Sequence, residues 1–157
     1  MYGRPTLNKR QWSAVSTEEV EALCVHIGVE AFPAGALGEN LRLSGVKLAD
    51  VPSGSVIEFP SGARLAVGGQ NDPCANAARE LAQSYGALVG QYFVKQALGR
   101  RGVIGVVLAP GAVRPSDKVT ITFPDAGEAQ AEERDRHRAS PIPPIPMPIS
   151  YVLSRSK

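Results

Sequence analysis

The sequence predicts a single domain that is mainly β with helices, an α+β fold in which helices pack around a closed or nearly closed sheet. Short runs rich in β-branched residues recur between glycine and proline turns, and two helical patterns lie among them. Charge and proline are concentrated after residue 124, where these patterns stop. A chain of 157 residues buries roughly two thirds of its unfolded surface, so its core needs no disulfide. We therefore expect a folded domain over residues 1–124 and a tail over residues 125–157.

The first strand and helix are predicted near the N-terminus. Gln11–Ser16 is short and alternates in polarity, as a strand does. Ser16 and Glu19 form a capping box, which predicts a helix over Thr17–Ile27 that stops at Gly28. The apolar face of this helix has helical spacing and consists of Val20, Leu23, Cys24 and Ile27.

Loops and short strands follow in the middle of the chain. Ala31–Glu39 is rich in Gly, Ala and Pro and predicts a loop, after which Glu39–Leu43 resumes as a strand. Ser55–Phe59 and Ala63–Val67 are β-like runs, and the Pro60-Ser61-Gly62 turn between them predicts a hairpin.

A helix and two more strands complete the predicted domain. From Cys74 to about Leu98 the apolar residues repeat at three and four, which predicts an amphipathic helix that is broken or bent near Gly86 or Gly90. Val103–Leu108 is almost wholly apolar, as in a strand that is buried on both faces. Lys118–Phe123 alternates and is β-branched, as a half-buried strand is.

The C-terminal tail differs in composition from the rest. Asp125–Arg138 is charged and Ala-rich, and Ser140–Ser150 is dense in proline. Because proline fixes φ and lacks an N–H, this stretch is not expected to continue a sheet or a helix. We expect a flexible or polyproline-like tail; a proline-motif ligand for a partner domain and a segment laid along the domain surface are the alternatives.

Charge and hydropathy exclude several classes of function. The net charge of +2, without a dense Lys/Arg patch with interleaved aromatics, argues against a nucleic-acid partner. No apolar run approaches the roughly 18 residues that span a bilayer, and the N-terminus lacks the apolar core of a signal peptide. Two cysteines are too few for a secreted disulfide framework, so a reducing cytoplasm is the expected location and no membrane partner is expected.

Cys74 is the residue with the strongest chemical signal. Asp72 is placed to cap the following helix and Pro73 suits the first helical position, which puts Cys74 in the first turn. The helix dipole there favours a thiolate, the form that attacks electrophiles or ligates soft metals, while the charge of Asp72 opposes it. The alternative is that Cys74 is a small buried hydrophobe. Cys24 lies on an apolar helix stripe and is expected to pack in the core.

The other sequence features offer less chemistry. Zinc is not expected, because no CxxC occurs and neither His26 nor His137 has ligand spacing. No GxSxG occurs, and Gly99–Gly102 makes neither a phosphate loop nor a dinucleotide fingerprint. Arg100 and Arg101 present two guanidinium groups that suit a phosphate or carboxylate; a solvated turn is the alternative.

Several fragments occur in a characteristic order: Lys9-Arg10-Gln11-Trp12-Ser13-Ala14-Val15-Ser16 before a helix that begins Thr17-Glu18-Glu19, then Gly38-Glu39-Asn40-Leu41 with Gly45, the Asn71-Asp72-Pro73-Cys74 turn, and Arg100-Arg101-Gly102-Val103 leading through Gly111 to Asp117-Lys118-Val119. In this order they resemble the MOSC domain, named for the C-terminal domain of molybdenum cofactor sulfurases. The resemblance covers roughly residues 9–123 and leaves the tail outside.

This resemblance implies a β-barrel-like fold with one cysteine at the mouth of the site. It implies that Cys74 either carries sulfur as a persulfide or ligates the metal of molybdenum cofactor (molybdopterin), in a family whose molybdenum members reduce N-hydroxylated substrates. It also carries the family's association with molybdenum ion and pyridoxal phosphate binding. The residues it nominates around the cofactor are Arg10, Glu39, Asn40, Asn71, Asp72, Arg100 and Arg101.

Three functions are compatible with these expectations. The first is a molybdenum-cofactor oxidoreductase with a small-molecule substrate and a redox partner. The second is a sulfur carrier or sulfurtransferase that takes sulfur from a donor protein through Cys74. The third is a non-enzymatic domain that binds a partner. Family members usually begin with an additional strand and a Gly-Asp turn, so we expect either a domain shortened at its N-terminus or a true start upstream of Met1.

Overall fold

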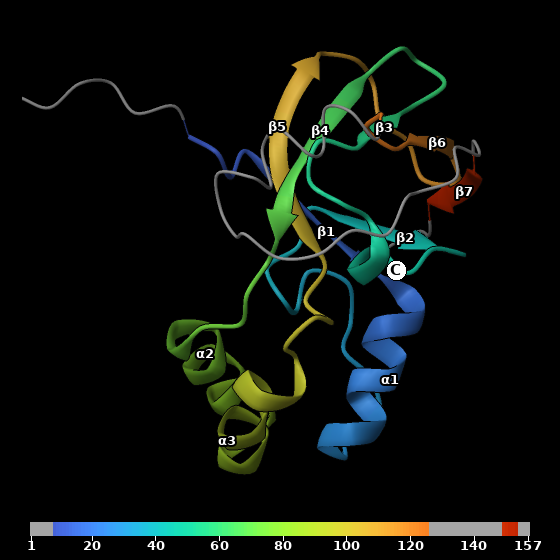
Figure 1. Cartoon of the computed structure of the whole chain (residues 1–157). Helices are drawn as coiled ribbons and strands as arrows, with labels where there is room; N and C mark the ends of the chain where they lie inside the picture. The colour runs from blue at the N-terminus through green and yellow to red at the C-terminus, as the bar shows by residue number, and fades with distance from the viewer. Residues whose placement is uncertain (1–7, 126–148, 154–157) are drawn as a thin grey trace, which may run out of the picture.

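Strands in the described part of the chain form a closed barrel with the helices gathered at one end (Figure 1). The structure is a computed structural model, and it describes residues 8–125 and 149–153. The strands are β1 (Trp12–Ser16), β2 (Leu41–Ser44), β3 (Val56–Glu58), β4 (Arg64–Gln70), β5 (Val103–Ala109), β6 (Lys118–Thr122) and β7 (Ile149–Leu153). The helices are α1 (Thr17–Ile27), the 3-10 turn η1 (Leu48–Asp50), α2 (Ala75–Tyr85) and α3 (Ala87–Gln96). The predicted α+β barrel is therefore confirmed.

Closure of the barrel depends on β1, which pairs on both of its edges. It runs parallel to β2, with Ala14 opposite Leu41, and antiparallel to β5, with Ala14 opposite Val103. The ring then continues in the order β2, β7, β6, β3, β4 and β5 through antiparallel pairs. Because every strand has two neighbours, the sheet closes on itself as a barrel.

The helix α1 begins and ends where the sequence predicts. Ser16 is the N-cap, and its Oγ accepts a hydrogen bond of 3.3 Å from the N–H of Glu19. Gly28 ends the helix in the left-handed conformation, with φ of 78°. The second half of the predicted capping box is absent, because the carboxylate of Glu19 accepts the N–H of Ala49 instead, at 2.9 Å. This contact links α1 to the segment that follows β2.

The second predicted helix is two helices separated by Gly86. Gly86 has φ of 102° and ψ of 157°, a conformation that interrupts the helix and that glycine adopts readily. Gly90 lies within α3, and an added Cβ there would lie 2.6 Å from the carbonyl oxygen of Ala78. Gly90 therefore lets α2 and α3 pack closely rather than bending the chain.

The prediction that Val103–Leu108 is buried on both faces is wrong for its second half. Val103 is fully buried, whereas Val107 and Leu108 are about half exposed, at 45% and 51%. The reason is that β1 pairs with β5 only from Val103 to Gly105, so beyond that point β5 has a partner on one edge alone. An apolar run does not reveal where its neighbouring strand ends.

The strand β7 was not predicted, because residues 125–157 were expected to form a tail. It lies between β2 and β6, with Ile121 opposite Ile149 and Leu43 opposite Leu153. Its residues follow the last proline of the chain, Pro148, so every residue can donate a backbone hydrogen bond. Residues 126–148 and 154–157, which include most of the predicted tail, lie outside the described residues.

The buried apolar side chains form two clusters. One fills the barrel and contains residues of β1 to β6, together with Val46, Leu48 and Val51. The other lies between the helices and the adjoining loop and contains Val15, Leu23, Cys24, Phe32, Leu37, Leu81 and Phe93 among others. Cys24 is 5% exposed, which confirms the prediction that it packs in the core. None of the helices described is long and apolar enough to cross a membrane.

Gly102 is a position where a side chain cannot be accommodated. Its φ is 75°, and an added Cβ would lie 1.8 Å from the carbonyl oxygen of Ala14. We expect Gly102→Ala to lower the free energy of unfolding by about 3 kcal/mol or more, from strain and the clash together. Gly99→Ala is the matched control, since Gly99 also has positive φ, 69°, but has open space around it; it should cost only about 1 kcal/mol. Urea unfolding of both variants measures the difference, and equal losses would contradict the role given to the clash.

Candidate functional site

Cys74 lies at the exposed start of α2, in the turn that follows β4. It is the N-cap residue itself, with φ of −131° and ψ of 163°. The predicted assignment of Asp72 as the cap and Pro73 as the first helical residue is therefore wrong by two positions. The proline instead stiffens the turn before the cap, and the alternative that Cys74 is a buried hydrophobe is excluded by its exposure.

The surroundings of Cys74 favour its thiolate. The N–H group of Ala77 is the main cause of a lowered pKa of Cys74, and the N–H of Asn76 and the charge of Arg101 act in the same direction. Slight burial opposes them but does not prevail. The thiol makes no capping hydrogen bond, so these helix amides remain available to stabilise the negative sulfur. At a given pH the site therefore holds more of the thiolate, the nucleophile and soft ligand, than a free cysteine does.

Arg101 is the buried cation of the site. It is 5% exposed, and its Nη1 donates to the carbonyl oxygen of Asp72 at 2.8 Å. Its Nη2 donates to the carbonyl oxygen of Leu37 at 3.4 Å, while its Nε is buried without a partner among the described residues. Arg101 thus ties the cysteine turn to the loop before β2 and brings positive charge to the sulfur.

Asn71 is the buried polar neighbour in the same turn. Its N–H donates to the carbonyl oxygen of Gly102 at 2.8 Å, which joins the end of β4 to the start of β5. The residue is 4% exposed, and neither its Oδ1 nor its Nδ2 has a partner among the described residues. Because a buried amide without partners is costly, Asn71 is a candidate for hydrogen bonding to a bound group or to water.

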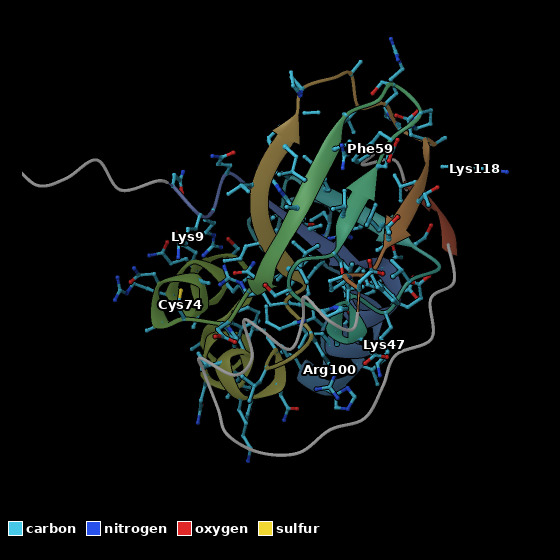
Figure 2. All side chains as sticks on the ribbon, turned by 45° about the horizontal axis from the view of Figure 1, so that its top comes forward. Lys9, Lys47, Phe59, Cys74, Arg100 and Lys118 are labelled. Carbon is cyan, nitrogen blue, oxygen red and sulfur yellow. The ribbon has the colours of Figure 1, made fainter. Side chains whose placement is uncertain are left out.

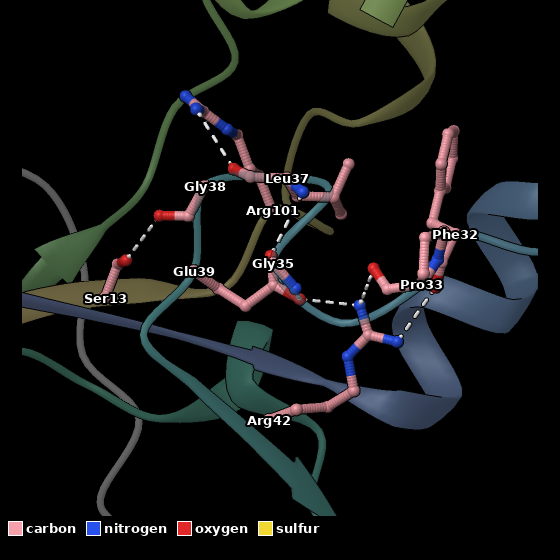
Figure 3. A network of polar contacts seen from close by, with 9 residues as sticks. All are labelled: Ser13, Phe32, Pro33, Gly35, Leu37, Gly38, Glu39, Arg42 and Arg101. Carbon is pink, nitrogen blue, oxygen red and sulfur yellow. Dashed lines mark hydrogen bonds and ion pairs between the residues drawn. The ribbon is translucent and has the colours of Figure 1, made fainter. Parts of the chain in front are cut away.

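Glu39 does not present its carboxylate to Cys74 but holds the loop before β2 (Figure 3). Its oxygens accept the N–H groups of Gly35 at 2.8 Å and Leu37 at 3.0 Å. Arg42 completes the clamp with a 2.6 Å ion pair to Glu39 and with hydrogen bonds to the carbonyl oxygens of Phe32 and Pro33. The clamp fixes Leu37, whose carbonyl oxygen then accepts Arg101.

Asn40 connects the same loop to β1. Its Oδ1 accepts the N–H of Ser13 at 2.9 Å, and its own N–H donates to the carbonyl oxygen of Ser13 at 3.0 Å. The Oγ of Ser13 donates to the carbonyl oxygen of Gly38 at 3.1 Å (Figure 3). Glu39 and Asn40 thus extend the β1–β2 pairing into the loop and contribute to the site through the backbone that they position.

The remaining nominated residues lie apart from this network. Arg10 is exposed just before β1, and Asp72 is exposed but contributes its carbonyl oxygen to Arg101. Arg100 donates from Nη1 to the carbonyl oxygen of Gln96 at 3.0 Å and, together with Lys47, lines a cavity to which neither Cys74 nor Arg101 contributes. Figure 2 shows Arg100 and Lys47 near each other and away from Cys74. The structure does not bring Arg100 and Arg101 together around one anion.

Sequence reasoning missed several groups that shape the site. The amides of Asn76 and Ala77 and the carbonyl oxygen of Leu37 are backbone groups, which residue identity does not reveal. Arg42 carried a usable signal, because it is a charged residue between Leu41 and Leu43 in a predicted strand. A charge at such a position is expected to need a partner.

Molybdenum cofactor fits the residues around Cys74 at its metal end only. The thiolate is a suitable soft ligand, and the described residues contain no cluster of three or more His, Cys, Asp or Glu that could hold a metal alone. The two guanidinium groups expected to bind a pterin phosphate face different sites, and Arg101 is committed to two backbone carbonyl oxygens. The expected phosphate site is therefore not formed by this pair.

Comparison with known proteins gives a consistent family. The family model described as the MOSC domain matches residues 5–120. YuaD of Bacillus subtilis (strain 168), whose name assigns it provisionally to metal-sulfur cluster biosynthesis, is 39% identical over 127 residues, which cover 77% of this chain and 66% of YuaD. The chain thus spans just under two thirds of that relative.

Two solved structures support the same assignment of fold. The crystal structure of the YuaD protein from Bacillus subtilis superposes with a TM-score of 0.71 at 37% identity, over 76% of this chain and 67% of that one. The crystal structure of YiiM from Geobacillus stearothermophilus gives a TM-score of 0.61 at 23% identity, over 82% of this chain and 64% of that one, and this likeness concerns the fold alone.

The lowered pKa of Cys74 predicts how its alkylation depends on pH. In a Cys24→Ser variant, the rate of alkylation by iodoacetamide should reach half its maximum at a pH below that of a free cysteine, because the helix amides and Arg101 favour the thiolate. Arg101→Gln should move the midpoint to higher pH, since it removes the nearby positive charge. Arg79→Gln, an exposed change on α2, is the control. A midpoint of the Cys24→Ser protein at or above that of free cysteine would contradict the assignment.

The buried clamp and an exposed ion pair should differ in their contribution to stability. The Glu39 and Arg42 side chains are 2% and 13% exposed, whereas both side chains of the Lys47–Asp50 pair are 68% exposed. We expect Glu39→Gln to lower the free energy of unfolding by about 3 kcal/mol, because it removes one charge of a buried ion pair. Asp50→Asn should cost about 1 kcal/mol at most. Urea unfolding compares the two, and similar losses would show that Glu39 is dispensable for the loop.

Proposed function

The chain belongs to the MOSC domain family, and on that premise we propose that Cys74 accepts, carries and passes on sulfane sulfur as a persulfide. The proposal is carried by the position of Cys74, which is exposed and lies beside groups that stabilise its thiolate, namely the amides of Asn76 and Ala77 and the charge of Arg101. Cys24, the other cysteine, is buried and so is closed to a donor. A persulfide carrier needs one reachable, activated thiol, and the chain has one.

The proposed step conserves atoms and electrons. The Cys74 thiolate attacks the terminal sulfur of a persulfide on a donor protein. The sulfur–sulfur bond of the donor breaks, its cysteine leaves as a thiolate, and a new sulfur–sulfur bond joins the terminal sulfur and its proton to Cys74. No oxidant is consumed, because one persulfide is exchanged for another. Transfer to an acceptor thiolate repeats the step with the roles reversed.

The residues around Cys74 have separate roles in this step. The amides of Asn76 and Ala77 stabilise the thiolate before attack and the persulfide anion after it. Arg101 adds positive charge from a fixed position, since two backbone carbonyl oxygens hold its guanidinium. Exposure at a helix start suits a donor that is itself a protein. The name of YuaD, which points to metal-sulfur cluster biosynthesis, supports a role in sulfur delivery.

Ligation of molybdenum cofactor by Cys74, with reduction of N-hydroxylated compounds, is the second candidate. Two buried polar groups of the site favour this candidate, the side-chain amide of Asn71 and the Nε of Arg101. Neither has a hydrogen-bond partner among the described residues, so a bound group could satisfy them. When bound, the cofactor would supply the redox chemistry and this chain would supply one thiolate ligand and orientation. Protein expressed with cofactor supply should then contain molybdenum in amounts that Cys74→Ala abolishes, whereas the carrier proposal expects no such dependence.

Intact-mass measurement tests the carrier directly. After incubation with a cysteine desulfurase and cysteine, wild-type protein should gain about 32 Da, the mass of one sulfur atom. Cys24→Ser should keep the adduct and Cys74→Ser should lose it, and a reductant should remove it. Arg101→Gln should form it more slowly at pH 7. Modification of neither cysteine would reject the proposal.

A further inference from the structure

A cavity lies beside α1, between that helix and the segments that follow β2 and α3. Its volume is about 590 Å³, within the size range of small-molecule sites. Residues of α1 and of the segments 45–49 and 98–100 line it, whereas Cys74 and Arg101 do not. Figure 2 shows Arg100 on the part of the molecule away from Cys74. The cavity is therefore separate from the thiol site.

The two carboxylates that line this cavity are engaged with its walls. Oε1 of Glu18 accepts the N–H of Gly45 at 2.7 Å, and its Oε2 accepts the hydroxyl of Ser16 at 2.9 Å. Oε1 of Glu19 accepts the N–H of Ala49 at 2.9 Å, and its Oε2 is buried out of reach of any ligand. These contacts join α1 to the segment that follows β2.

Arg100 is the lining residue that presents free donors. Its Nη1 donates to the carbonyl oxygen of Gln96 at 3.0 Å, which is the one hydrogen bond of its side chain within the described residues. Its Nε and Nη2 have no partner there and, unlike the Oε2 of Glu19, they are not shut off from solvent. The other lining cation, Lys47, already pairs with Asp50 at 3.2 Å. Two free nitrogens of one planar guanidinium suit the two oxygens of a carboxylate.

Apolar side chains line the cavity next to this guanidinium. Leu98 lines it although 65% of the residue is exposed, and Val46 and Ala22 contribute from the segment after β2 and from α1. Since only Gly99 separates Leu98 from Arg100 and both line the cavity, a small ligand can touch both. An exposed leucine gains from apolar cover, so the ligand that suits this pair carries hydrocarbon next to its negative charge.

We propose that this cavity binds an apolar monocarboxylate, a small acid with a hydrocarbon chain or ring. The carboxylate accepts hydrogen bonds from Nε and Nη2 of Arg100, and the hydrocarbon covers Leu98. An inorganic anion would satisfy the guanidinium but would leave the leucine exposed, and a neutral hydrocarbon would do the reverse. The inference goes beyond the sulfur chemistry proposed for Cys74 and does not rest on it.

A ligand series on the full, unaltered chain tests the proposal. Octanoate is the probe, and amide chemical shifts report where it binds: the signals of Ala22, Lys47 and Gly99 should move, while those of Asn76 and Ala77 at the thiol site stay fixed. Octanamide keeps the hydrocarbon without the charge, and acetate keeps the charge without the hydrocarbon. Each should bind about tenfold more weakly or less, because one loses the charge-assisted hydrogen bonds and the other the apolar contact.

Two pairs of variants assign the contacts. Arg100→Gln should weaken octanoate about tenfold and leave octanamide unchanged, whereas Arg79→Gln, an exposed change on α2, should alter neither. Leu98→Ser should weaken octanoate about fivefold. Leu88→Ser is its matched control, because Leu88 is 66% exposed on α3 but does not line the cavity. Thermal unfolding checks that each variant is folded, and the ligand series decides the matter if one is not.

Four results would overturn the proposal. Octanoate at millimolar concentration could leave the cavity signals unmoved, or octanamide or acetate could bind as tightly as octanoate. Leu88→Ser could weaken octanoate as much as Leu98→Ser does, which would indicate unspecific attachment to exposed apolar side chains. The shifted signals could surround Cys74, which would place the acid at the thiol site.

Discussion

The buried guanidinium of Arg101 is the contact on which the candidate site depends. It joins the carbonyl oxygen of Asp72, in the cysteine turn, to that of Leu37, in the loop before β2. Burying a guanidinium is costly unless its donors find acceptors, and these two carbonyl oxygens satisfy Nη1 and Nη2, so both segments are held where they meet Arg101. The same requirement places a permanent positive charge beside the Cys74 sulfur, at the start of a helix that already favours an anion.

The supports of Arg101 explain why the nominated motif residues do not face the thiol. Glu39 and Arg42 shape the loop that presents Leu37, and Asn40 fastens that loop to β1. On the other side, Gly102 lets the chain approach Ala14 closely enough for β5 to enter the barrel directly after Arg101. These residues affect the sulfur only through the position of the backbone. Substituting them should therefore lower the stability of the domain, and should change the reactivity of Cys74 only as a consequence.

Adjacent arginines therefore serve two sites. Arg101 lies beside the cysteine, while Arg100 lines the cavity beside α1. The separation matters for function, because a paired anion site next to Cys74 would favour a phosphate-bearing cofactor, whereas a single buried cation beside an exposed thiolate suits transfer of sulfur between proteins.

The sequence by itself determined the α+β barrel class, the bounds of α1, the core position of Cys24 and the family, because local patterns and short motifs carry this information. It also located Cys74 at the start of a helix. Only the tertiary structure decided that Glu39 and Asn40 brace a loop, that Arg100 leaves the thiol site, and that β7 closes the barrel. These outcomes depend on contacts between distant segments, such as Leu37 and Arg101, which are 64 residues apart. Residue identity does not encode which backbone group such a side chain will meet.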